Sequence, residues 1–308
     1  MRLTALVFLA VLTVLPTANA QRRVFAEIFT NSHCGPCASM HAAVDAHITT
    51  TQRDERVVVV YYHLPVYLDD PIYQANTVQP MQRAQVLGGV SGTPTTFFDG
   101  LRQTGGYHNW PVVLDALLDS SVSSTITATM SLIKDSVVID YTVELTGARK
   151  ELSLYAVVVE DITYRGRNGV SDHSGAMRAL LTPVTGYPLE FDERGRASGR
   201  LQVPVGSSWS REKLRGVISL QGPGLAVSYD VLEIDPVTTN IDEAEVQLEE
   251  GRVFVHSMSG NLIIDPFATF GTIESIRGHI ASLVPSGFYC VRVERGLTSE
   301  VHGISVVR

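Results

Sequence analysis

Cysteine is scarce in this sequence: the 308-residue chain contains three, at positions 34, 37 and 290. So few cysteines in a protein of this length exclude a disulfide framework of the kind that holds small secreted domains together. Cys34 and Cys37 are separated by two residues, whereas Cys290 is remote from both. One close pair and one distant cysteine indicate that the pair performs chemistry.

Basic residues are also fewer than acidic ones: the sequence has 24 Lys and Arg against 32 Asp and Glu, which gives a formal net charge of −8. A negative chain argues against binding to nucleic acid or to acidic lipid surfaces. The sequence contains no low-complexity segment and no tandem repeat. We therefore expect no nucleic acid among its partners.

Long apolar runs are missing except in residues 1–20. Arg2 precedes the apolar run Leu3–Leu15, and Ala18-Asn19-Ala20 has the small residues of a cleavage site. This pattern predicts a signal peptide removed before Gln21, because the run is too short and wrongly flanked for a membrane span. We expect an exported protein located in the periplasm, at the outer membrane or cell surface, or secreted. No cysteine follows the cleavage point, so no lipid anchor is expected there; an uncleaved membrane anchor is the alternative.

A βαβ unit is predicted directly after this segment. Arg23–Thr30 has the pattern of a buried strand, the residues after Cys34 have helical spacing, and Val57–Leu64 is typical of a central parallel strand. The cysteine pair then lies where the first strand becomes the helix. Residues 69–86 predict helical material interrupted by Pro71 and Pro80.

The end of this first region, which we assign to residues 21–121, has its own signals. Thr95–Phe98 predicts a short strand, Asp99-Gly100 a hairpin turn, and Trp110–Leu118 a helix. After residue 121 the sequence pattern changes to short segments of alternating apolar and polar residues, which predict strands, separated by Gly, Asp and Ser turns. We expect a β-sandwich over residues 122–240 and a small all-β module over residues 241–308.

The sequence Cys34-Gly35-Pro36-Cys37 at a helix start favours thiol–disulfide chemistry. Unpaired N–H groups and the helix dipole at this position stabilise a thiolate, and such cysteines have pKa values of about 3.5–7.5. We expect Cys34 to attack a disulfide and Cys37 to resolve the mixed disulfide. Pro36 is tolerated because it lies in the first helical turn. Such a centre needs no cofactor, because the cysteine pair holds the electrons.

A second part of this centre is predicted at Thr93-Pro94, in a loop that leads into a strand. Pro94 is a candidate cis-proline. A cis bond would present the backbone N–H and C=O of Thr93 beside the sulfurs, where an extended substrate could pair with them. We therefore assign Thr93 and Pro94 to substrate binding.

Several motifs resemble a known family. The motif CGPC after a strand, with GVSGTPTTFFDG downstream, resembles the thioredoxin superfamily. More narrowly, EIFTNSHCGPC, YYHLPVYLDDPIYQAN and GGVSGTPTTFFDG together resemble the Omp28-related outer membrane proteins, and NGVSDHSGAMRALLTPVTGYPLEF resembles the β-rich part of that family. The last part, ending LVPSGFYCVRVERGLTSEVHGISVVR, is similar to a type IX secretion sorting domain. The resemblance implies an α/β thioredoxin-like domain over residues 21–121, with exported thiols and disulfides as partners and an electron-transfer partner of unknown identity.

Two positions depart from the thioredoxin pattern. His33 stands before the first cysteine where thioredoxins usually carry Trp, and a nearby imidazolium would favour the Cys34 thiolate and a more oxidising pair. We therefore assign His33, with Gly35 and Pro36, to redox tuning. The position of the buried acid of thioredoxins is occupied by Ile28, and the adjacent Glu27 should point to the other face of the strand.

Other interpretations of the same residues remain open. The pair could be a structural disulfide, although a short loop gives little chain-entropy stabilisation. Cys34, Cys37, His41 and His63 could instead hold copper or zinc. The thioredoxin fold could also be the scaffold of a surface binding protein without activity.

Several conspicuous residues outside the motif are expected to have structural roles. We expect Cys290 to be a buried, inert thiol, Arg83 and Arg178 to form surface salt bridges, and residues 164–175 to be a solvated loop.

Overall fold

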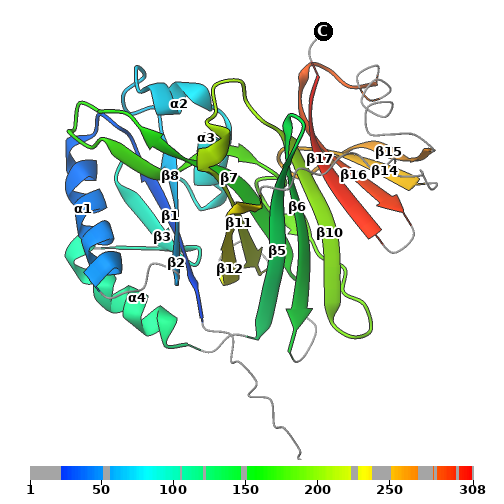
Figure 1. The fold of residues 1–308 in the computed structure, drawn as a ribbon, viewed down its shortest axis with the longest axis horizontal. Coiled ribbons are helices and arrows are strands. Elements are labelled where there is room, and N and C mark those ends of the chain that lie inside the picture. The colour runs from blue at the N-terminus through cyan, green and yellow to red at the C-terminus, as the bar shows by residue number, and fades with distance from the viewer. Residues whose placement is uncertain are drawn as a thin grey trace, which may run out of the picture.

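The computed structural model describes residues 22–50, 56–104, 106–120, 123–146, 151–222, 228–237, 251–269, 280, 283–295 and 298–306. The expected signal peptide in residues 1–20 lies outside this range. The described chain forms a mixed α/β fold with two large sheets that are mostly β and few helices (Figure 1). Within it, no helix has the length and apolar character needed to cross a membrane.

The predicted βαβ unit is present. Strand β1 (Val24–Thr30) leads into helix α1 (Gly35–Thr50), which is followed by β2 (Val57–His63) parallel to β1. On its other side β1 pairs antiparallel with β3 (Thr95–Phe98), which turns into β4 (Leu101–Arg102). The turn uses Asp99 and Gly100, both at positive φ, as expected for a tight hairpin.

Each of the remaining α-helices has a proline in its first turn. Pro71 and Pro80 do not interrupt a helix; each lies in the first turn of one, α2 (Pro71–Ala75) and α3 (Gln79–Val86), where no N–H is needed. Helix α4 (Trp110–Leu118) follows a short 3₁₀ turn, Tyr107–Asn109, and matches its predicted bounds. A second 3₁₀ turn covers Arg211–Lys213.

The first sheet has the order β12-β11-β7-β8-β2-β1-β3-β4, with β9 paired to β7. Its later strands are β7 (Ser153–Thr163), β8 (Asp172–Leu180), β9 (Tyr187–Pro188), β11 (Leu214–Gln221) and β12 (Ser228–Ile234). The sheet therefore crosses the boundary that we predicted after residue 121. Strands β2 and β8, which join its two parts, pair at one residue position, Tyr61 with Ala176. Gly175 beside this pair has φ +72°, and a Cβ there would lie 2.7 Å from the Val59 carbonyl oxygen, so only glycine fits.

The second sheet has the order β13-β5-β6-β10-β17-β16-β14-β15. Its strands are β5 (Ser124–Ile133), β6 (Ser136–Leu145), β10 (Arg196–Pro204), β13 (Pro236–Val237), β14 (Gly251–Ser257), β15 (Leu262–Thr269), β16 (Gly287–Arg295) and β17 (Thr298–Val306). The parallel pair β10–β17 joins it across the second predicted boundary, after residue 240. Hydrogen-bonded strands cross both boundaries, because sequence periodicity defines strands but not their partners. The three predicted ranges are thus not three separate sheets.

Buried side chains form layers around the first sheet. Helices α1 and α4 cover one face of β1, β2 and β3, to the left in Figure 1, with residues such as Met40 and Leu114. The other face packs around Phe29, Tyr62 and Tyr155. A third cluster fills the space between β7 and β11 of the first sheet and the second sheet, and includes Cys290. Cys290 is free and 3% exposed, and burial raises the pKa of its thiol to about 12, which confirms the expected inert thiol.

A charged network is buried in the first sheet, against our expectation for Arg83. The guanidinium of Arg83 is fully buried and donates to both carboxylate oxygens of Glu27 at 2.7 Å and to the Val184 carbonyl at 3.0 Å. Tyr62 donates to Glu27 at 2.9 Å, and Arg83 stacks over the ring of Tyr155. Arg178 is buried as well and donates to Glu160 at 2.6 Å. Surface pairing was predicted wrongly for both arginines, because composition alone does not reveal a buried acidic partner.

Removing Arg83 should be costly. Substitution of Arg83 by Ala leaves the Glu27 carboxylate buried without a counter-ion, and breaking such a pair costs about 3–5 kcal/mol. The matched control is Arg200→Ala, which removes a similar bidentate pair with Asp140 that is about half exposed and should cost roughly 0–1 kcal/mol. Urea unfolding of both variants measures the difference. Equal losses of stability would contradict this account of Arg83.

Candidate redox site

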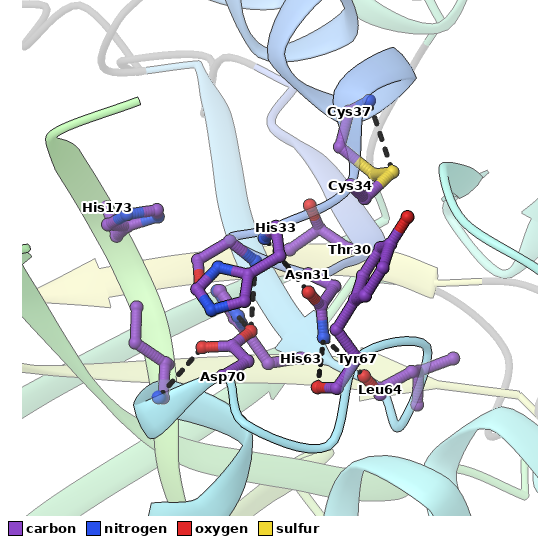
Figure 2. Close-up of polar contacts among 12 residues, drawn as sticks. Thr30, Asn31, His33, Cys34, Cys37, His63, Leu64, Tyr67, Asp70 and His173 are labelled. Carbon is purple, nitrogen blue, oxygen red and sulfur yellow. Dashed lines mark hydrogen bonds and ion pairs between the residues drawn. A yellow bond between two sulfur atoms is a disulfide. The ribbon is translucent and has the colours of Figure 1, made fainter. Parts of the chain in front are cut away.

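The cysteine pair forms a disulfide at the start of α1. The two sulfurs are 2.13 Å apart, and the Cys37 amide lies 3.3 Å from the Cys34 sulfur and points toward it (Figure 2). Cys34 is 4% exposed and Cys37 is fully buried, whereas Gly35 and Pro36 between them are exposed. The motif therefore presents its exposed edge on the Cys34 side, with Cys37 one turn deeper.

The proline loop lies beside the disulfide. The Thr93–Pro94 peptide bond is cis, as predicted, and the carbonyl oxygen of Thr93 lies 3.7 Å from the Cys34 sulfur. Two segments separated by 59 positions in the sequence are thus brought together at the sulfur. A backbone acceptor next to the reactive sulfur can pair with an extended polypeptide.

His33 is held by contacts to both of its ring nitrogens. The Arg167 amide donates to Nδ1 of His33 at 3.4 Å, and the Ser32 hydroxyl oxygen lies 3.1 Å from the same nitrogen. The other nitrogen, Nε2, lies 3.9 Å from a carboxylate oxygen of Asp69. These contacts fix the orientation of the ring beside Cys34.

Polar side chains fix the turn between β1 and α1. The Asn31 side chain donates to the carbonyls of Leu64 and Tyr67 at 2.8 and 3.2 Å, and accepts from the His33 amide at 2.9 Å. Asp70 accepts from the Ser32 amide at 2.9 Å (Figure 2). Both side chains tie the segment before Cys34 to the loop that follows β2.

The carboxylate of Asp70 accepts hydrogen bonds from three residues. Besides the Ser32 amide, its carboxylate accepts from His63 Nδ1 at 2.7 Å and from the Ile72 amide at 2.9 Å, which caps α2. Burial alone would raise the pKa of Asp70, but the hydrogen bonds and charge of His63 and the bond from Ser32 hold it well below its usual range. Asp70 is therefore a buried carboxylate that positions other residues.

Three histidines cluster behind the redox motif. The ring of His63 lies 5.6 Å from that of His173, which lies 6.5 Å from that of His41. His41 stacks on Tyr61 at 4.2 Å and shares a hydrogen bond with Thr30. Burial and the neighbouring His63 and His173 lower the pKa of His41 to about 3, and burial followed by His63 lowers the pKa of His173. Both rings are therefore neutral near neutral pH.

The proposed Cys/His metal set is not assembled. Cys34 and Cys37 are joined as a disulfide, and His63 directs Nδ1 to Asp70. Within the described part of the chain, no three His, Cys, Asp or Glu residues are grouped so that they could hold a metal ion.

The predicted solvated loop at residues 164–175 contacts the segment that carries Cys34. Asn168 donates to the Cys34 carbonyl at 3.2 Å, and His173 bonds the Tyr164 carbonyl at 3.0 Å. Sequence analysis missed Asp70, Asn168 and His173. The contacts of Asp70 and Asn168 to the segment before α1 join residues 38 and 134 positions apart, which a local pattern does not reveal. Gly166 was the one local signal in this loop, since its close backbone contact requires a residue without a Cβ.

Comparison with known proteins identifies a solved structure that shares the fold of this chain. No family model matches the chain, and no curated protein matches it. Among solved structures, HBP35 of Porphyromonas gingivalis aligns with a TM-score of 0.61 at 15% identity, covering 93% of this chain and 99% of that one. A domain of the outer membrane lipoprotein Omp28 from the same organism aligns over 38% of this chain and 92% of that one, with 14% identity and a TM-score of 0.29. The chain shares the fold of HBP35 along nearly its whole length, whereas the second score is too low to carry an argument.

The neutral His41 predicts acid sensitivity. Its folded pKa of about 3 is below its usual 6.5, so the unfolded chain binds more protons between these values, and stability falls as pH drops below about 6.5. The slope from one such group reaches about 1.4 kcal/mol per pH unit. In urea titrations from pH 7.5 to 4.5, His41→Phe should show a shallower dependence than the wild type.

The control for this measurement is His108→Phe, because His108 is exposed. Asp99, whose burial raises its pKa to about 6 despite Arg22, adds stability as pH falls, with the opposite slope. This contribution is common to all three proteins and cancels in the comparison. A His41→Phe profile parallel to the wild type would show that His41 is not the responsible group.

Proposed function

We propose that this protein is an exported thiol–disulfide oxidoreductase that exchanges disulfides in extracytoplasmic proteins. The observation that carries the proposal is the Cys34–Cys37 disulfide at the start of α1, next to the Thr93 carbonyl. A structural staple would not need an exposed edge or a backbone acceptor beside its outer sulfur. The pair itself holds the two electrons, and no cofactor is required.

The proposed reaction starts from the reduced pair when the protein acts as a reductase. The Cys34 thiolate attacks a client disulfide, forming one S–S bond and releasing one client thiolate, which takes up a proton. Cys37 then loses its proton and attacks Cys34, which restores the Cys34–Cys37 disulfide and releases the second client thiol. The client gains two electrons and two protons; the protein supplies both electrons and the Cys37 proton, and solvent supplies the proton that the Cys34 thiol released when it ionised. The oxidase direction is the reverse.

Solvent access supports this division of roles. Cys34 is the more exposed of the two residues, at 4%, whereas Cys37 is fully buried, so a client disulfide would reach Cys34 first. The backbone of Thr93, next to Pro94, would orient the client chain by pairing with it, as sequence analysis proposed. Glu27 does not serve as the proton acceptor of Cys37 in this proposal, because Arg83 and Tyr62 occupy its carboxylate.

We further propose that the chain is an Omp28-related exported protein with a thioredoxin-like part, a sandwich part and a sorting-domain-like C-terminal part. The motifs around Cys34 and Pro94 and the fold shared with HBP35 support this assignment. The apolar N-terminal segment and the family resemblance support a periplasmic, outer-membrane or cell-surface location. Its client proteins and an electron-transfer partner would be exported proteins as well.

A second candidate function is partner binding by the β-rich part. A cleft of about 520 Å³ lies in that part and is lined by Tyr141, Tyr187, Phe191, Arg292 and Glu294 among others. None of the residues assigned to the redox site lines this cleft. A binding protein that used the redox fold only as a scaffold would bind its partner there, without covalent exchange.

A trapping variant separates the two functions. Cys37→Ser keeps the attacking Cys34 but removes the resolving thiol, so mixed disulfides with exported clients should accumulate and be released by dithiothreitol. Cys34→Ser/Cys37→Ser is the matched control and should trap nothing. Non-covalent partners recovered equally with both variants, without any mixed disulfide, would favour the scaffold function.

The reduction potential then gives the direction of exchange. Equilibrium titration of the pair against glutathione should give roughly −180 to −120 mV for an oxidase or isomerase, and roughly −270 mV for a reductase. A pair that resists reduction well below about −300 mV would be a structural disulfide, and the proposed enzyme activity would be wrong.

A further inference from the structure

The hairpin loop between β7 and β8 is shaped to approach another backbone closely. The Tyr164 amide donates to Ser171 at its base, and the Gly166 amide donates to Val170 at 2.9 Å. The side-chain oxygen of Asn168 accepts from the Val170 amide at 3.1 Å, which fixes the direction of its amide nitrogen. These hydrogen bonds lie within the loop and hold both its backbone and the Asn168 side chain.

This loop makes three hydrogen bonds to the segment that carries Cys34. The Asn168 amide donates to the Ser32 carbonyl at 3.3 Å, and the Arg167 amide donates to His33 Nδ1 at 3.4 Å. The Asn168 side-chain nitrogen donates to the carbonyl of Cys34 at 3.2 Å. A Cβ at Gly166 would lie 2.0 Å from the Ser32 carbonyl oxygen, so the approach depends on glycine. Consecutive residues before α1 are thus each held by a loop more than 130 positions away.

We propose that Asn168 is a positioning residue for the redox centre, acting through the peptide bond between Cys34 and Gly35. This inference rests on the proposed exchange chemistry and names a residue that controls it. The carbonyl of Cys34 and the N–H of Gly35 belong to one planar trans peptide, so they point in opposite directions. Holding the carbonyl on Asn168 therefore fixes the direction of the first N–H of α1.

The consequence appears in the reduced protein. The free N–H groups of the first turn, including that of Cys37, stabilise a Cys34 thiolate through their dipoles. When the peptide plane is free to rotate, this stabilisation weakens and the dithiol becomes less favourable relative to the disulfide. Loss of the Asn168 bond should thus make the pair harder to reduce.

The test uses two variants of Asn168 in the full chain. Asn168→Ala removes both side-chain bonds, whereas Asn168→Asp keeps the acceptor for Val170 but loses the donor to Cys34 and adds a negative charge. Both should lower the equilibrium constant for reduction by glutathione about threefold to tenfold, or roughly 15–30 mV, with the larger change for Asp. The thiolate absorbance of Cys34 should titrate at higher pH in both.

Arg165→Ala is the matched control, because Arg165 is exposed on the same loop. It should leave the equilibrium and the thiolate titration unchanged. A merely structural role for Asn168 would lower the melting temperature of its variants without moving either readout, and that result would overturn the proposal.

If Asn168→Ala does not fold, the neutral variant Asn168→Ser decides the outcome: it keeps a side-chain oxygen but has no amide donor for the Cys34 carbonyl, whereas the charge added by Asn168→Asp would by itself disfavour the thiolate. Neither readout uses a client protein, so absence of client exchange would contradict the proposed function and leave this inference to be judged separately.

Discussion

The buried pair of Arg83 and Glu27 is the interaction on which the arrangement of the first sheet depends. Arg83 lies on α3, Glu27 on β1, and the Val184 carbonyl and the Tyr155 ring, both contacted by Arg83, come from the β-rich part of the chain. Two charges taken out of water are stable only when each is paired and hydrogen-bonded. The pair therefore requires β1, α3 and β7 to lie in one relative position, and it reinforces the single-residue contact between β2 and β8.

That position has a consequence at the C-terminal end of β1, where the chain enters the redox motif. Because β7 and β8 share a sheet with β1 and β2, the loop joining them lies against Ser32, His33 and Cys34. The redox motif is thus enclosed by two distant segments, the proline loop at Thr93 and the loop at Asn168. A site built in this way is incomplete in the first 121 residues alone, although these residues contain both cysteines.

The local part of this architecture could be predicted from sequence, and the long-range part could not. The strands and helices from Arg23 to Leu118 follow from hydrophobic period and turn residues, and the cis bond at Pro94 follows from its loop context. Strand partners carry no such local signal. The continuous sheets, the burial of Arg83 and the contact of Asn168 with Cys34 all depend on residues more than 50 positions apart, so sequence analysis assigned these residues to the surface.

The same contacts change the account of how the cysteines would be tuned. Sequence analysis placed His33 beside Cys34, and both ring nitrogens of His33 face other groups, Nδ1 the Arg167 amide and Nε2 the Asp69 carboxylate. His41 is neutral because burial lowers its pKa to about 3, and Glu27 is bound by Arg83. With these side chains neutral or already paired, a Cys34 thiolate would depend chiefly on the backbone dipoles at the start of α1. Such dipoles act only when their direction is fixed, and for the peptide after Cys34 that direction is set by a side chain from the far half of the chain.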